Sequence, residues 1–212
     1  AIYAIPVNGW TIALTVVAAD FTYYWKHRVS HEVRGLWSYH SVHHSSQEFN
    51  LSTAIRLPFY GVFTGGLFYI PALLVGFDPV ILLVSKFSVL IYQYWVHTEM
   101  IGKLGWFDKL FNSPSNHRVH HGSNPQYIDK NHAGIFMIWD RMFGTYVEEK
   151  EKVSYGLTTP INTKNPFKIA FFELIEIIKD MAALEGWKNR FLLLLKIPGW
   201  QPSQVPVMKT EQ

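Results

Sequence analysis

Ten histidines in a chain of 212 residues offer the clearest chemistry in this sequence. Eight of them fall into three groups with matching spacing: His27-Arg-Val-Ser-His31, His40-Ser-Val-His43-His44 and His117-Arg-Val-His120-His121. On an α-helix, residues i and i+4 lie about 40° apart, and an added i+3 residue stays within an arc of ~100°. Each group can therefore aim its imidazole nitrogens at a common point.

Eight converging imidazoles exceed the four ligands of a single tetrahedral ion, so the count predicts a centre of two metal ions. Neutral imidazole suits iron, copper, zinc and nickel, so ligand type leaves the metal open. Iron could activate dioxygen, whereas zinc has no redox chemistry. A lone histidine is better interpreted as a surface or hydrogen-bonded core residue, but three groups with matching spacing favour a metal site.

Two further histidines, His97 and His132, are additional candidate ligands. His97 ends an apolar segment and precedes Thr98-Glu99; its alternative role is a hydrogen-bonded position beside the metal. His132 follows the last histidine pair in a polar stretch, where a loop histidine can also point elsewhere.

Carboxylates near these histidines are candidates to accept their second N–H. Asp20 precedes His27 by seven residues and shares its helix face; Asp129 and Asp140 are further candidates. Glu32 adjoins a predicted ligand, and we predict it as a catalytic residue that contacts substrate or carries a proton. A solvated or capping carboxylate is the alternative for each.

The elements that must position the histidines are predicted to be membrane helices. Charged residues make up 17% of the chain, against about 25% in ordinary soluble domains. Three long apolar segments follow one another: 1–25, 57–77, which Pro58 and Pro71 kink or break, and 79–96. About 20 apolar residues span a bilayer as a helix. A soluble all-helical bundle with apolar core helices is the alternative.

Basic residues flank these segments: Lys26, Arg28, Arg34, Arg56, Lys103, Lys109 and Arg118. If they share one side, the positive-inside rule makes that side cytoplasmic. We therefore expect an integral membrane protein with its metal site at the cytoplasmic face, in the inner membrane of a bacterium or the endoplasmic reticulum of a eukaryote. The start at Ala1, within an apolar stretch and without Met or signal-peptide features, indicates that further residues precede it.

The expected fold class is all-α, a membrane helical bundle with a helical cap, in one domain. Residues 1–101 hold the membrane helices and the first two histidine groups, and residues 102–166 form a cytoplasmic cap with the third. Residues 167–200 form amphipathic helices that begin after an Asn165 N-cap and lie on the membrane surface or on the cap.

Some other chemistries are excluded by residue types and others fail on spacing, although residue types alone leave a serine triad open. The chain has no cysteine, so it has no disulfide or thiolate ligand, and its mild charge of +3 without a Lys/Arg block predicts no nucleic-acid partner. His31-Glu32 is not a zinc-protease motif because position 35 is glycine. No glycine-rich phosphate loop and no nucleophile elbow is present.

Four stretches carry a resemblance to a known family: HRVSHEV (27–33), HSVHHSSQEFNLSTAIR (40–56), 94–149 around NHRVHH, and YGLTTPIN (155–162). With them, most of the chain resembles the fatty acid hydroxylase/sterol desaturase superfamily, and within it the alkylglycerol monooxygenase branch and its bacterial relatives. The resemblance implies a helical di-iron membrane oxygenase with two Fe ions and O2. The implied core ligands are His27, His31, His40, His43, His44, His117, His120 and His121, with His97 a further candidate and Glu32 functionally important.

The same resemblance implies a substrate and an electron source. Enzymes of that branch hydroxylate the ether-linked carbon of a glycerol lipid, the hemiacetal breaks down, and tetrahydrobiopterin supplies electrons. His132 stands where an aromatic residue is common in that branch. Because this chain contains no fused cytochrome b5-type domain, electrons must come from a separate donor or a pterin. A desaturase or C-4 methyl oxidase on the same centre, and a non-redox zinc-binding membrane protein, are the alternatives.

Overall fold

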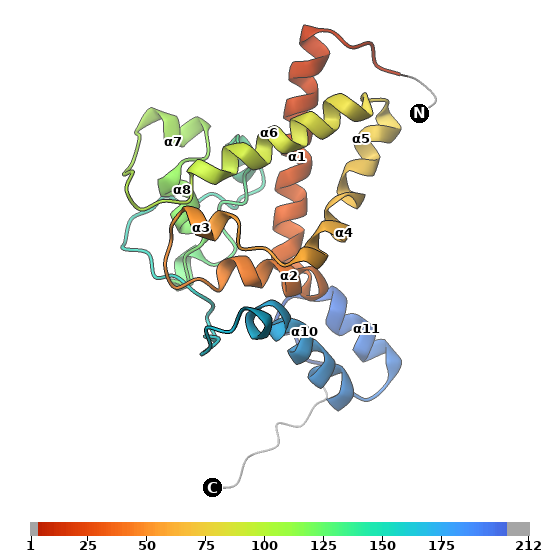
Figure 1. Ribbon diagram of the computed structural model, residues 1–212, viewed down its shortest axis with the longest axis vertical. Helices are drawn as coiled ribbons and strands as arrows, with labels where there is room; N and C mark the ends of the chain where they lie inside the picture. The colour runs from red at the N-terminus through yellow and green to blue at the C-terminus, as the bar shows by residue number, and fades with distance from the viewer. Residues whose placement is uncertain (1–3, 203–212) are drawn as a thin grey trace, which may run out of the picture.

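The protein is all-helical, as predicted, in the computed structural model, which describes residues 4–202 (Figure 1). Two isolated bridges, Phe111 with Phe136 and Gly122 with Tyr155, are the β-pairing found within that range. The helices in chain order are α1 (Gly9–Glu32), α2 (Arg34–His44), α3 (Leu51–Ala54), η1 (Phe59–Gly61), α4 (Val62–Gly65), η2 (Leu67–Tyr69), α5 (Ile70–Val75), α6 (Pro79–Trp95), α7 (Trp106–Leu110), α8 (Pro114–His120), η3 (Pro125–Tyr127), α9 (Ile138–Met142), α10 (Pro166–Ala183) and α11 (Trp187–Leu195).

The long helix α1 is defined at both ends by local chemistry. At its start the Asn8 side chain accepts from the backbone N–H of Thr11, and the Thr11 hydroxyl accepts from the N–H of Asn8, a reciprocal capping box. At its end Val33 is extended, and this single residue separates α1 from α2. The chain turns sharply there, so the histidines at the end of α1 are brought close to those on α2.

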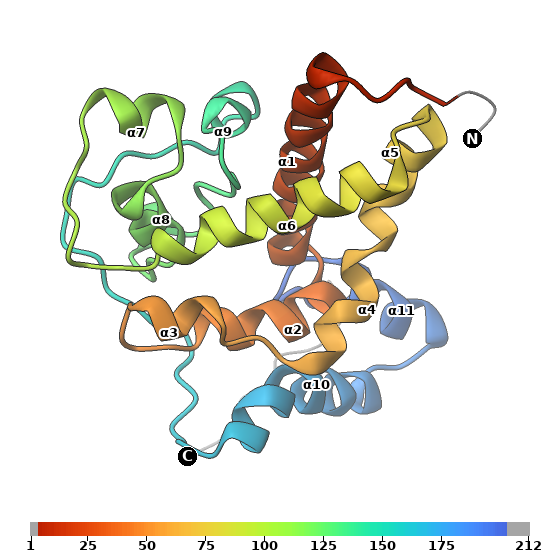
Figure 2. The same ribbon diagram turned by 45° about the horizontal axis from the view of Figure 1, so that its top comes forward.

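Helix α6 packs across α1 (Figure 2), and this crossing holds the main apolar core. Ala19 of α1 and Val89 of α6 are fully buried, with Tyr69, Ala72 and Leu82 beside them. The small side chain of Ala19 lets the two helices approach closely. The predicted apolar segment 57–77 is broken into η1, α4, η2 and α5 instead of forming one helix.

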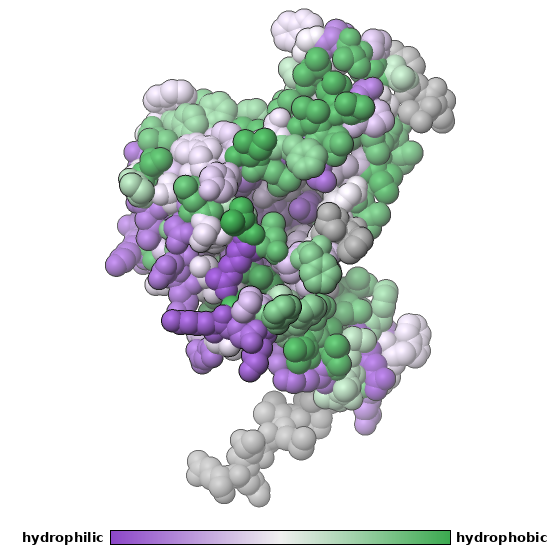
Figure 3. Space-filling view, viewed as in Figure 1, coloured by the Kyte–Doolittle hydropathy of each residue, from purple (hydrophilic) through white to green (hydrophobic). Residues whose placement is uncertain are grey.

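Among residues 4–202, no helix combines the length and the apolar character needed to cross a membrane. Large apolar side chains are nevertheless exposed on α5 and α6, including Leu74 (70%), Val80 (65%) and Ile91 (73%). Hydrophobic residues gather on the upper part of the visible surface, over α1 and α5 (Figure 3).

The short helices between α6 and α10 are held in place by buried polar side chains. Helix α8 has only seven residues, too few for stability on its own. Asn112 donates to the Ala133 carbonyl at 2.9 Å, and Asn131 donates to the carbonyls of Asn116 and Val147. These buried amides connect α8 to the loops around it, so tertiary hydrogen bonds compensate for its short length.

Hydrogen bonds to the Asp20 carboxylate hold the loop that precedes α9 against α1. Its carboxylate accepts from the backbone N–H groups of Ile135 and Phe136 at 2.6 and 3.0 Å, and from Trp139 Nε1 at 2.8 Å. Gly134 lies against the same carboxylate and leaves no room for a side chain: an added Cβ would lie 2.8 Å from Val89 Cγ1 and 2.9 Å from Tyr23 Cδ1.

Gly134→Ala is therefore expected to destabilise the protein. Overpacking a closed site costs roughly 1–3 kcal/mol, and the clash here involves three side chains on the two helices α1 and α6. The midpoint of thermal unfolding should fall, measured against Gly102→Ala as control, because nothing lies within 4 Å of a Cβ at Gly102. Equal midpoints for the two variants would show that the loop does not pack on α1 in this way.

The C-terminal helices α10 and α11 dock on α2. Helix α10 begins as predicted, with the Asn165 side chain accepting from the N–H groups of Phe167 and Lys168 and Pro166 in the first turn. The buried Arg34 of α2 pairs with Glu173 at 2.9 Å and Asp180 at 2.6 Å. One part of α2 therefore holds α10 while another carries histidines.

Candidate metal centre

Nine histidines from four places in the chain meet inside the protein. They come from the end of α1, from α2, from the residue after Val96 and from α8 with its C-cap, and each is 7% exposed or less. The nine are His27, His31, His40, His43, His44, His97, His117, His120 and His121. All eight histidines of the three sequence groups, together with His97, are thus brought together.

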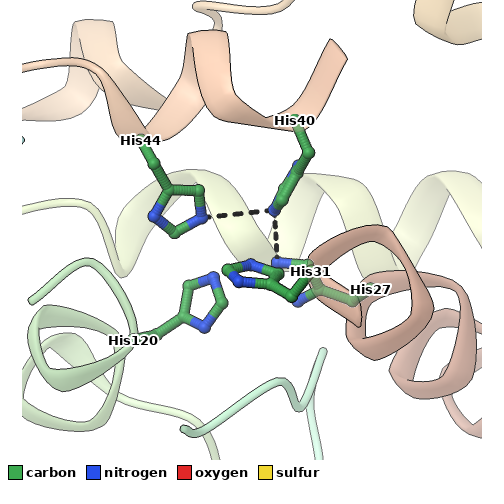
Figure 4. A group of neighbouring side chains, drawn as sticks. All are labelled: His27, His31, His40, His44 and His120. Carbon is green, nitrogen blue, oxygen red and sulfur yellow. Dashed lines mark hydrogen bonds between the residues drawn. The ribbon is translucent and has the colours of Figure 1, made fainter. Parts of the chain in front are cut away.

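The nine histidines divide into two groups that could each hold a metal ion. The first group is His27, His31, His40, His44 and His120 (Figure 4), and the second group is His43, His97, His117 and His121. Within each group the candidate ligand atoms lie within 4.8 Å of one another. Two groups agree with the two-metal count predicted from the sequence.

The division cuts through two of the three sequence groups, whereas each group was expected to aim at one point. On α2, His40 and His44 belong to one group and His43 to the other. On α8, His117 and His121 share a group while His120 joins the opposite one. The i and i+4 rings are only about 40° apart, whereas the third ring opens the arc to ~100°, wide enough to face a second point.

Hydrogen bonds to the backbone fix which ring nitrogen is free. Four rings donate Nδ1–H to a carbonyl at 2.6 to 2.9 Å: His27 to His132, His43 to Thr53, His97 to Gln93 and His120 to Lys130. A neutral imidazole carries one proton, so each of these rings presents a lone pair at Nε2. The nitrogen left free is the one that faces the group.

Two of these free nitrogens face each other, which a metal cation explains. Nε2 of His43 lies 3.2 Å from Nε2 of His97, and both carry lone pairs, so neither can donate to the other. Metal–nitrogen bonds of about 2.1 Å place neighbouring ligands of one tetrahedral ion roughly 3.4 Å apart. A shared cation would convert this contact from repulsive to favourable.

Other ring nitrogens in the two groups have no partner among the described residues. They are His31 Nε2, His117 Nδ1, His120 Nε2 and His121 Nε2, all buried. Leaving a buried polar atom unpaired costs about 1–3 kcal/mol, so four such atoms at one place indicate a missing partner. The donor set contains imidazoles alone and therefore fits iron, copper or zinc.

Four of the buried rings are in the protonation state that metal binding needs. Burial, followed by the neighbouring imidazoles, lowers the pKa of His117, His120 and His121 well below the ordinary value. Burial also lowers the pKa of His132. These rings are consequently neutral at pH 7, with a lone pair to offer.

The metal-free protein is expected to lose stability in acid. Each lowered pKa means that the unfolded chain binds a proton that the folded chain rejects, from the unfolded pKa of about 6.5 down to the folded value. Stability is full above about pH 6.5, and each such histidine removes about 1.4 kcal/mol per pH unit below it. Denaturant titrations of metal-free protein between pH 7.5 and 5.5 measure this slope.

A matched variant tests the origin of that slope. His132→Phe removes one titrating ring, so its slope should be smaller than that of the unmodified protein by about 1.4 kcal/mol per pH unit. A pH-independent unfolding midpoint in both proteins would contradict the burial of neutral histidines.

His132 lies beside the first group but outside both. It is fully buried, and neither of its ring nitrogens has a partner in the described part of the chain. Its ring centre is 5.0 Å from that of His31 and 5.5 Å from that of His120. Asp140 holds it there by accepting from its backbone N–H at 2.8 Å. Its predicted role as a ligand stays a prediction.

The candidate carboxylates have different roles from one another. Asp129 Oδ1 accepts from His31 Nδ1 at 3.1 Å, the arrangement expected beside a metal ligand. Asp20 and Asp140 instead accept from backbone N–H groups and position the loop. Glu32 pairs with Arg28 at 2.8 Å and is partly exposed, and its predicted catalytic role stays a prediction.

Arg118 is a positioning residue that the sequence analysis missed. It stands between His117 and His120 on α8 and pairs with Glu149 through two bonds of 2.7 Å. It also donates to the carbonyls of Thr98 and Ile101, close to His97 in the chain. The arginine inside the third histidine group was the available signal, but its partners are distant in sequence.

The fold and the site together define an all-helical protein with two adjacent histidine groups that could bind metal. A family model described as Fatty acid hydroxylase matches residues 12–145. The chain belongs to the fatty acid hydroxylase family, and the resemblance inferred from the sequence is confirmed.

Curated relatives narrow the comparison. The chain is 46% identical over 197 residues to the alkylglycerol monooxygenases of Xenopus tropicalis and Homo sapiens, which covers 93% of this chain and 44% of each relative. An ornithine lipid hydroxylase, OlsE of Rhizobium tropici, is 31% identical over 140 residues, 65% of this chain and 42% of that protein. The chain spans less than half the length of these relatives. No solved structure matches it.

Proposed function

We propose that this chain is the metal-binding core of a lipid monooxygenase that uses O2 and two Fe ions to hydroxylate an alkyl or ether-linked carbon. The observation that carries the proposal is the pair of adjacent groups of buried histidines, with lone pairs of two rings facing each other. Similarity to alkylglycerol monooxygenases supports a glycerol ether lipid as the substrate class. Bound iron would supply the activation of dioxygen, since the protein's own side chains offer no oxidant.

The residues around the two groups would orient the ligands. Backbone carbonyls hold the Nδ1 protons of four rings, so Nε2 stays available for metal. We assign His132 as a further ligand beside the first group, because its two ring nitrogens are buried without partners among the described residues. We assign Glu32 as the group that contacts substrate or carries a proton at its carboxylate, with Arg28 fixing that carboxylate.

A membrane location also belongs to this proposal. Exposed apolar side chains on α5 and α6 support contact with lipid or with membrane helices of a longer chain. The proposed arrangement places residues 1–101 in the membrane, 102–166 in a cytoplasmic cap and 167–200 along the surface. A bacterial protein would lie in the inner membrane and a eukaryotic one in the endoplasmic reticulum. A separate donor, such as tetrahydrobiopterin, would deliver the electrons.

The proposal is tested with protein purified in mild detergent, analysed for metal and assayed with 1-O-alkylglycerol, reduced pterin and O2. The expected results are two irons per polypeptide, oxygen consumption and release of the substrate's alkyl chain as an aldehyde. Two zincs that iron cannot replace with gain of activity would instead establish the non-redox alternative. A product with a new double bond would establish the desaturase alternative.

A further inference from the structure

A groove on the protein is lined by residues that neighbour the ligand candidates of α2 in the sequence. It has a volume of about 1120 Å³ and is formed between the chain around α3 and the segment that leads into α10. Figure 2 shows α3 above the start of α10. The lining includes Val42 and Ser45, which flank the ligand candidates His43 and His44 in the sequence.

The side chain of Arg56, which lines this groove, has no hydrogen-bond or ion-pair partner among residues 4–202. Of the six arginines in the chain, Arg28, Arg34, Arg118, Arg141 and Arg190 each donate to a carboxylate or a carbonyl. The half-buried Arg56 side chain makes no hydrogen bond or ion pair with the described residues. Burial lowers the pKa of its guanidinium, and no carboxylate opposes that shift. An anion in the groove would stabilise it.

The rest of the lining favours an amphiphilic anion over a simple ion. Lys164 adds a second cation, and Glu48 is the one carboxylate among the lining residues. Apolar side chains line the same groove and are largely exposed: Ile55 at 74%, Phe59 at 75% and Phe167 at 74%. Cations beside exposed aromatic rings fit a phosphate group joined to a hydrocarbon chain.

A single backbone carbonyl connects this groove to the histidines. The carbonyl of Thr53 accepts from His43 Nδ1 at 2.9 Å and from the backbone N–H of Arg56 at 3.1 Å. Arg56 is thereby anchored next to a candidate metal ligand. A headgroup held at Arg56 would lie close to the centre where an attached chain is oxidised.

We propose that this groove binds the phosphate-bearing headgroup of a glycerol ether lipid, with Arg56 and Lys164 contacting the phosphate. The inference rests on the proposed function, which supplies the ether lipid as the ligand, but a measurement of lipid binding alone can test it. It predicts that the preferred lipid carries a phosphate on the glycerol, and that neutral alkylglycerol binds more weakly.

The test measures equilibrium binding of 1-O-alkyl-glycerol 3-phosphate and of 1-O-alkylglycerol with the same chain to the full chain in detergent. Losing one charge-assisted contact of about 1.5–3 kcal/mol corresponds to a roughly 10- to 100-fold change in Kd. Arg56→Gln should weaken the phosphate lipid about 10-fold or more and leave the neutral lipid unchanged, and Arg56→Lys should recover most of the loss. Lys164→Gln should weaken it less, because Lys164 is exposed. Lys168→Gln, on α10 but outside the lining, is the charge control.

Each outcome decides a different point. Equal affinity of the unmodified protein for both lipids, or equal loss in Arg56→Gln and Lys168→Gln, would overturn the inference. Competition by glycerol 3-phosphate as strong as that by the lipid would overturn it too, because the apolar lining would then be irrelevant. Tight binding of the phosphate lipid without turnover would support the groove and count against the proposed monooxygenase function alone. Unchanged circular dichroism and metal content in Arg56→Gln separate lost contact from lost folding.

Discussion

His120→Ala and His121→Ala are expected to remove different metal ions, although the two residues are adjacent in the sequence. His120 belongs to the first group and His121 to the second. Metal content should fall from two ions to about one in each variant. Turnover should fall at least about 100-fold, because changes even to residues behind the ligands cost about 10- to 100-fold. Elemental analysis and oxygen consumption measure the two effects.

Double variants distinguish the two groups. His44→Ala combined with His120→Ala removes two ligands of one group and should still leave about one ion. His120→Ala combined with His121→Ala should leave none. Lys130→Ala is the control, because it keeps the carbonyl that accepts from His120 Nδ1. The same metal content in both double variants would show that the nine histidines do not form two groups.

Arg118→Met is expected to cause the largest loss of stability outside the ligands. The Arg118 and Glu149 side chains are 10% and 16% exposed, so removing the guanidinium leaves a nearly buried carboxylate without its partner. Breaking such a pair from one side costs about 3–5 kcal/mol, which for a chain of this size lowers the unfolding midpoint by about 10 °C. Calorimetry on the metal-free protein measures it.

A second variant shows whether the stability loss in Arg118→Met comes from the unpaired Glu149 carboxylate or simply from the loss of a charge. Adding Glu149→Gln to Arg118→Met removes the unpaired carboxylate and should recover most of the stability. Lys103→Met breaks the solvent-exposed pair with Glu148 and should leave the midpoint unchanged. If the double variant were no more stable than Arg118→Met, the loss would come from the contacts of Arg118 with Thr98 and Ile101 instead.

The ligands could be predicted from the sequence because helical spacing is local information. His40, His43 and His44 must share a side of any helix that contains them, whatever surrounds it. Which ring joins which group depends on how α1, α2 and α8 meet, and this is a tertiary property. The assignment of His43 to one group and His40 to the other therefore required the structure.

Other features were hidden for the same reason. Asp20 shares a helix face with His27, which favoured a role behind a ligand, but its carboxylate accepts from the backbone N–H groups of Ile135 and Phe136, and His27 Nδ1 bonds to the His132 carbonyl. The break of segment 57–77 into short pieces was readable from Pro58 and Pro71. The groove at Arg56 could not be predicted from the sequence, because the residues that form its other side begin about a hundred residues later in the chain.

The acceptors behind the ligand rings have a consequence for how this centre tolerates change. Four of them are backbone carbonyls, and every amino acid supplies one. Substituting Thr53, Gln93 or Lys130 alters a side chain but leaves the acceptor in place. Among the five rings whose Nδ1 contacts another described residue, His31 alone depends on a replaceable side chain, the Asp129 carboxylate. The orientation of these four rings is thus set by the path of the backbone, whereas that of His31 depends on one particular side chain.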